Sequence, residues 1–100
     1  MIEALDKLNF KHAEYREKGL DMNIEPDGGN LSQGEKQLIC FSRILIKKKK
    51  IIILDEATAN IDLKTEESIQ NAVENEFTDC TMMIIAHRIQ TVLHCDKIMV

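Results

Sequence analysis

Apolar residues recur at helical spacing at the start of the chain, from Ile2 to Leu8, and predict a short amphipathic helix. The polar stretch 11–18 follows without such a pattern. Residues 19–30 lack periodicity, and their last five positions hold the proline, glycine and asparagine that tight turns require. We therefore expect a loop that leads into the next helix.

A second helix is predicted from Ser32, which has capping-box spacing to Glu35. Apolar residues at helical spacing follow between Leu38 and Leu45, and the lysines 47–50 close the pattern. The helix should have about four turns. The lysine run could be a nuclear-localisation or nucleic-acid patch, but lysines at a helix C-terminus also complement the helix dipole, and we favour that interpretation.

The remaining chain alternates between strand and helix patterns. The apolar run 51–54 predicts a strand covered on both faces, as in a parallel sheet. Residues 81–86 predict a further strand. A helix should begin near Asp62, with Ile69, Val73 and Phe77 on one side. A short helix over 89–94 and the start of a third strand over 97–100 complete the pattern, which predicts an α/β fold with a parallel sheet and flanking helices.

Composition narrows the possibilities. The chain has 100 residues and 44% apolar content, which suits one small globular domain. A net charge of −4 argues against a nucleic-acid or membrane-surface binder. Three cysteines without C-x-x-C spacing indicate neither a disulfide framework nor a zinc site. The first residues have no leader pattern and the longest apolar run is too short to span a bilayer, so we expect no transmembrane segment.

Charged residues follow the predicted strands where a parallel sheet binds its ligands, at the carboxyl ends. Asp55 and Glu56 follow the first strand, and His87 follows the second. In that arrangement Asp55 would hold Mg²⁺ directly or through water, and Glu56 would polarise an attacking water. His87 could contact a transferred phosphoryl group. The turn at Ser32 offers a second phosphate-directed feature, because free backbone N–H groups and the helix dipole meet there.

Each motif also has a simpler interpretation. An Asp-Glu pair after an apolar strand is often a helix start or a solvated turn. Ser32 with Glu35 is more often a plain capping box than a phosphate site. A histidine such as His87 is more often satisfied by backbone hydrogen bonds than functional. The combination of motifs, rather than any single one, therefore carries the functional hypothesis.

In order and spacing, four segments resemble the C-terminal half of an ATP-binding cassette (ABC) nucleotide-binding domain. Leu31-Ser32-Gln33-Gly34-Glu35 resembles the signature motif, and 51–56 resembles the Walker B strand with its catalytic glutamate. Residues 59–62 resemble the D-loop, and His87 resembles the switch histidine. The amino-acid sequences of segments 27–32, 38–40 and 55–59 are most similar to those of the C subfamily, the multidrug-resistance-associated exporters. The fold implied is a partial P-loop-NTPase-like sheet.

The sequence departs from the family pattern at three positions. Gln33 replaces the first glycine of the signature pair, Glu35 replaces its glutamine, and Ile61 stands where leucine is typical. Ser32 and Gly34, which would approach the phosphate, remain.

A larger departure is the absence of a G-x-x-x-x-G-K-[ST] phosphate loop, of the Q-loop and of the aromatic residue that stacks on adenine. Gly29 and Gly34 have the glycine spacing, but Glu35-Lys36 follows them and no strand precedes them. The resemblance thus implies a truncated cassette. Residues 1–30 would be the end of the helical subdomain with the loop to the signature, and 31–100 the signature helix and the C-terminal part of the ATPase core.

The resemblance also implies cofactors and partners. Two cassettes of this family sandwich ATP, so the signature residues would contact a nucleotide held by a second nucleotide-binding domain. The expected nucleotide contacts are Leu31, Ser32, Gln33, Gly34, Glu35 and Asp62. Asp55 with Mg²⁺, Glu56 and His87 would act on a nucleotide in their own half. The parent protein would couple ATP hydrolysis to export through transmembrane domains, with this domain at the cytosolic face and without nucleic acid, and the isolated chain should not turn over ATP.

Three other functions remain open from the sequence. A DNA-repair or chromosome-maintenance cassette carries similar motifs, although the acidic balance and the lack of heptads before the signature disfavour it. A non-enzymatic module that pairs with intact cassettes is a second possibility. An α/β domain with coincidental motifs is the third, and four ordered matches disfavour it.

Overall fold

A parallel pair of strands forms the centre of the fold. The computed structural model describes residues 1–100, and in it β1 (Ile51–Asp55) pairs with β2 (Thr81–Ile85). The register sets Ile51 beside Thr81 and Asp55 beside Ile85. The helix α4 (Leu63–Glu76) makes the crossover that parallel strands require. The α/β class with a parallel sheet and flanking helices is therefore confirmed.

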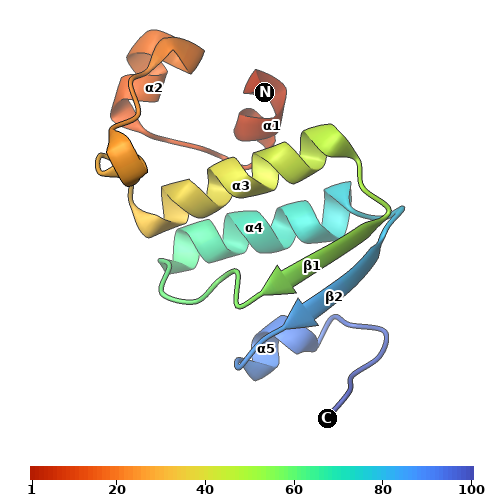
Figure 1. The fold of residues 1–100 in the computed structure, drawn as a ribbon. Coiled ribbons are helices and arrows are strands. Elements are labelled where there is room, and N and C mark those ends of the chain that lie inside the picture. The colour runs from red at the N-terminus through yellow and green to blue at the C-terminus, as the bar shows by residue number, and fades with distance from the viewer.

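Two long helices cover one face of this sheet. Figure 1 shows α3 (Gln33–Lys47) beside α4 on that face, with α1 (Ile2–Lys7) against α3. The helix α2 (Ala13–Lys18) lies further from the sheet, and α5 (Ile89–Val92) follows β2. Short 3₁₀ turns occupy Gly19–Asp21 and Pro26–Gly28. No helix has the length and apolar character needed to cross a membrane.

The predicted capping box starts α3. The Glu35 amide donates to Ser32 Oγ at 3.2 Å, and the Ser32 amide donates to Glu35 Oε2 at 2.8 Å. These bonds satisfy two of the amides that a helix N-terminus leaves free. The helix ends at Lys48, whose left-handed backbone (φ 44°) stops it after Lys47. The helix predicted from the pattern 32–50 is thus confirmed.

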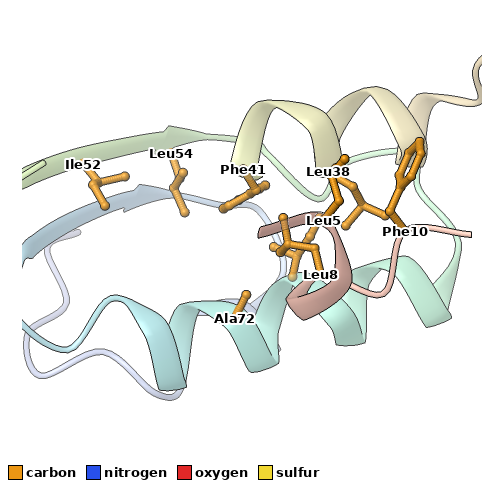
Figure 2. Close-up of a cluster of buried hydrophobic side chains, with 9 residues drawn as sticks. Leu5, Leu8, Phe10, Leu38, Phe41, Ile52, Leu54 and Ala72 are labelled. Atoms are coloured by element: carbon orange, nitrogen blue, oxygen red, sulfur yellow. The ribbon is translucent and has the colours of Figure 1, made fainter. Parts of the chain in front are cut away.

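The hydrophobic core lies between the helices and the covered face of the sheet (Figure 2). Phe41 from α3 and Ile69 from α4 are each only 2% exposed. They lie in one cluster with Ile52 and Leu54 of β1. The cluster comprises Leu5, Leu8, Phe10, Leu38, Phe41, Ile52, Leu54, Ile69 and Ala72. The first ten residues therefore belong to the same core as the sheet.

The prediction that the first strand is covered on both faces is wrong for this chain. Burial alternates along β1, and Ile51 and Ile53 are 71% and 63% exposed. Helices pack against only one face, so every second side chain of the strand meets solvent.

Two further expectations need correction. Residues 97–100 form no strand, because they do not pair with the free edge of β2. The polar stretch 11–18 contains α2, which hydrophobic periodicity did not reveal. This helix is held by Lys18–Glu14 pairing at 2.8 Å and by Tyr15, whose ring meets Phe10 edge-on at 5.2 Å.

Candidate functional site

Glu56 and His87 lie together at the carboxyl edge of the sheet. The Glu56 amide donates to the Ile85 carbonyl at 2.9 Å, which extends the ladder one residue beyond β1. His87 follows β2 closely, and its Nε2 lies 2.6 Å from Glu56 Oε1. The contact is an ion pair when the imidazole is protonated. The expectation that parallel pairing brings these two side chains to one edge is confirmed.

The backbone at Glu56 turns sharply out of the strand. Its φ is 48°, in the left-handed region that non-glycine residues seldom adopt. The Ala59 amide closes the turn by donating to the Glu56 carbonyl at 2.9 Å. Backbone strain of this kind is concentrated at functional sites, where surrounding contacts must hold it in place. Here the turn directs the Glu56 side chain to His87.

A cavity of about 240 Å³ lies behind the pair. Its walls are largely apolar and include Phe41, Ile69 and Ile84, whereas Glu56 and His87 contribute to its lining as polar groups. The Glu56 and His87 side chains are still 47% and 82% exposed. The pair is thus accessible to a water or a ligand from outside while resting on the covered side of the sheet.

Arg88 anchors the segment that carries His87. Its Nη1 donates to Glu66 Oε2 of α4 at 2.7 Å. Arg88 also lines the cavity. Sequence reasoning missed this pair, because nothing in the local pattern links two residues 22 positions apart.

Asp55 lies on the other side of the strand from this cavity. It continues the alternation of Ile51 and Ile53 and is exposed, and it does not line the cavity behind Glu56. All three predicted groups lie at the carboxyl edge of the sheet, but Asp55 is separate from the pair formed by Glu56 and His87. No group of three or more His, Cys, Asp or Glu side chains could hold a metal ion by itself. One free carboxylate nevertheless fits Mg²⁺, which keeps several waters and takes few protein ligands beside phosphates.

The signature-like turn is built around the N-terminus of α3. Ser32 caps the helix, and Gly34 is buried. A side chain at Gly34 would come within 3.0 Å of Thr65 Cγ2 and 3.3 Å of Asp62 Oδ1. Gly34 therefore allows the start of α3 to approach the start of α4 closely. Leu31, Gln33 and Glu35 complete this turn, with Gln33 exposed.

Asp62 caps α4 at the same place. Its carboxylate accepts from the Thr65 amide at 3.0 Å and from the Thr65 hydroxyl at 2.7 Å. These two hydrogen bonds lower the pKa of Asp62 below its usual value, and the bond from the Thr65 hydroxyl has the larger effect. Thr65 was not singled out in the sequence, although an aspartate N-cap accepts from the amide of the second or third helical residue, and Thr65 is the third. The structure thus forms two clusters, Gly34 with Asp62 and Glu56 with His87, and residues 31–35 do not line the cavity of the second.

Two parallel strands joined by a crossover helix, with charged side chains at their carboxyl ends, make this a part of an α/β domain of the class that binds ligands at that edge. A family model described as "ABC transporter" matches residues 1–59. The chain therefore belongs to the ABC transporter family.

Named relatives are more specific. The chain is 50% identical to human ATP-binding cassette sub-family C member 2 over 82 residues, 82% of this chain and 5% of that protein. It is 42% identical to ABC transporter C family member 3 of Arabidopsis thaliana over 98 residues, 97% of this chain and 6% of that protein. Identity to bile pigment transporter 1 of Saccharomyces cerevisiae is 51% over 81 residues, 81% of this chain and 5% of that protein.

These names confirm the resemblance to the C subfamily. The chain spans only 5% to 7% of the length of the relatives it matches. It corresponds to one stretch of a nucleotide-binding domain and not to a whole transporter.

Proposed function

We propose that this chain is the signature-to-switch portion of an ATPase domain that hydrolyses Mg²⁺-ATP in an intact parent to drive export. The observation that carries the proposal is the 2.6 Å contact between His87 Nε2 and Glu56 Oε1 at the carboxyl ends of two parallel strands. Open α/β sheets bind ligands at that edge. Membership of the ABC transporter family supports ATP as the nucleotide.

Glu56 acts as the base in this proposal. One oxygen, Oε1, is bound by His87, which leaves Oε2 to accept a hydrogen bond from the attacking water. His87 fixes the orientation of the carboxylate and can exchange this contact for one with the transferred phosphoryl group. Their exposure leaves room for both the water and the phosphate.

Asp55 would hold Mg²⁺, directly or through water. When bound, the ion neutralises charge on the phosphate oxygens. Asp55 is exposed at the end of β1, on the face without covering helices. A carboxylate in that position can face a phosphate chain without first breaking an internal hydrogen bond.

The turn 31–35 and Asp62 would contact a nucleotide held by a second nucleotide-binding domain. This division is supported by the separation of the two clusters in the chain. Ser32 and the Gly34 amide, at the N-terminus of α3, would be the groups nearest the phosphate. Transmembrane domains of an exporter would be the other partners, with the ATPase domain at the cytosolic face of the membrane.

The division of the chain at residue 30 is part of the same proposal. Residues 1–30 would come from the helical subdomain and residues 31–100 from the signature helix and the ATPase core. A phosphate loop is absent from the sequence. The isolated chain would therefore not turn over ATP by itself.

The test uses the parent protein encoded by the native transcript. Glu56→Gln should lower ATP turnover roughly 10²- to 10⁴-fold, as expected for loss of a general base, while ATP binding is retained. Glu67→Gln is the matched control, because Glu67 is exposed on α4. Equal turnover in the Glu56→Gln variant and the parent would refute the role of Glu56.

A further inference from the structure

A residue far from the signature-like turn holds the segment that leads into it. His12 precedes α2 as its N-cap, and its Nε2 lies 3.1 Å from the carbonyl oxygen of Asn30. Asn30 stands two positions before Ser32. This bond spans 18 residues and is partly buried. It links the N-terminal region to the entry of α3.

The imidazole of His12 is held in one orientation. Its ring stacks on Phe10 with a centroid distance of 6.3 Å and an interplanar angle of 19°. Phe10 is itself only 6% exposed and belongs to the core. The Nδ1 atom is buried and has no hydrogen-bond partner. Since a carbonyl oxygen only accepts, the proton of the ring belongs on Nε2, where it is donated to Asn30.

The side chain of Asn30 is also held on both of its polar atoms. Nδ2 donates to the Asn23 carbonyl at 2.8 Å, and Oδ1 accepts from the Glu25 amide at 3.1 Å. The next residue, Leu31, donates its amide to the Gly28 carbonyl at 3.0 Å. These contacts all come from the same loop. The bond from His12 is the one that connects Asn30 to a residue stacked on the core.

We propose that His12 is a positioning residue for the turn 31–35. By fixing the Asn30 carbonyl, it sets where the Ser32 hydroxyl and the Gly34 amide lie at the start of α3. The purpose of this positioning, contact with a nucleotide phosphate, rests on the proposed function. The tether itself is a property of this chain and can be tested without nucleotide.

The experiment is rapid-quench hydrogen exchange on the 100-residue chain at low micromolar concentration. The reporters are the amides of Leu31, Ser32 and Glu35, each of which donates a hydrogen bond in the turn. His12→Phe keeps a ring beside Phe10 and removes the donor. Exchange of the three amides should rise roughly 2- to 10-fold, the effect expected for loss of one hydrogen bond. Exchange over α4 should not change.

His12→Gln supplies the rescue, because its amide nitrogen can occupy the place of Nε2 and donate to Asn30. This variant should return the exchange rates to those of the unsubstituted chain. His94→Phe is the control for loss of an imidazole elsewhere, since His94 lies 3.9 Å from Glu74 of α4.

Three outcomes overturn the proposal. Equal acceleration over the turn and α4 in His12→Phe would mean that His12 only supports packing, and so would failure of His12→Gln to rescue. Unchanged exchange in His12→Phe would mean that no tether exists. If the tether holds but the Glu56→Gln test fails in the parent, the proposed function is at fault and not the role of His12.

Discussion

The two faces of the sheet differ sharply although the same two strands build them. On the closed face, Ile52 and Leu54 are 5% and 8% exposed beneath α3 and α4. On the open face, Ile51 and Ile53 are more than half exposed, and Met83 and Ile85 of β2 are 50% and 47% exposed. The apolar pattern of these strands is that of strands buried on both faces. It does not describe what this chain alone covers.

The same contrast divides the candidate site. Glu56 and His87 rest against the cavity on the closed side, so their geometry is set within the chain. Asp55 belongs to the open side, where no covering layer is present. The proposed base is thus preorganised here. Asp55, the proposed metal ligand, is not part of a cluster of metal-binding side chains in this chain.

The largest effect should come from removing the main contact of the closed face. Phe41→Ala should lower the free energy of unfolding by about 3–5 kcal/mol, because it leaves a cavity under β1. Ile53→Ala on the open face should change it by less than about 0.5 kcal/mol. Urea unfolding measured by circular dichroism tests both variants. A loss in Ile53→Ala as large as that in Phe41→Ala would remove the distinction between the faces.

The second prediction concerns self-association. The free strand edges and the apolar open face should make the chain associate as its concentration rises. Ile53→Lys places a charge in the middle of that face and should shift the distribution towards monomer in analytical ultracentrifugation. Leu20→Lys is the control, since Leu20 is similarly exposed (52%) but lies in a 3₁₀ turn away from the sheet. A monodisperse, cooperatively unfolding monomer for the unsubstituted chain would contradict this expectation.

How much of this could be foreseen depended on whether the interactions are local. The start of α3 was predictable because Ser32 and Glu35 carry the capping signal three positions apart. The meeting of Glu56 and His87 followed from the rule that parallel strands end at one edge. The left-handed backbone at Glu56 had no local signal. Neither did the tether from His12 to Asn30, which depends on the tertiary position of two loops.

The open face could not be predicted for a different reason. A run of four apolar residues looks the same whether one or two layers cover the strand. The run that contains Ile51 and Ile53 is entirely apolar, as in a strand buried on both sides. The chain nevertheless has only one covering layer of helices. Residues 97–100 illustrate the same limit, since an apolar segment becomes a strand only when a neighbouring strand supplies hydrogen-bond partners.

The third prediction tests the N-terminal cap of α4, one of the two helices that cover the closed face. The pKa of Asp62 is lowered by the Thr65 hydroxyl and amide, so the ionised carboxylate stabilises the fold. This contribution is present above the usual aspartate pKa of 3.8 and is lost as pH falls through the lowered value. Asp62→Ala should therefore lower the Tm at neutral pH, with a difference that disappears in acid. Asp62→Asn should keep an uncharged cap, so a pH dependence that survives in Asp62→Asn would assign it to another group.

The smallest effect should be a gain in stability at the C-terminal end of α3, the other helix that covers the closed face. Lys48 ends α3 in the left-handed conformation, with φ 44° and ψ 55°. Glycine adopts this conformation without a steric penalty, so Lys48→Gly should raise the free energy of unfolding by roughly 0.5–1 kcal/mol. Lys47→Gly, one residue earlier and still helical, should instead lower it by about 1 kcal/mol. Because both positions lie outside the sheet, neither change should alter self-association through the open face. Urea unfolding should give changes in the free energy of unfolding of opposite sign for the two variants, while their ultracentrifugation profiles stay the same. That result would show that the stability of the covered side can change without a change in self-association through the open face.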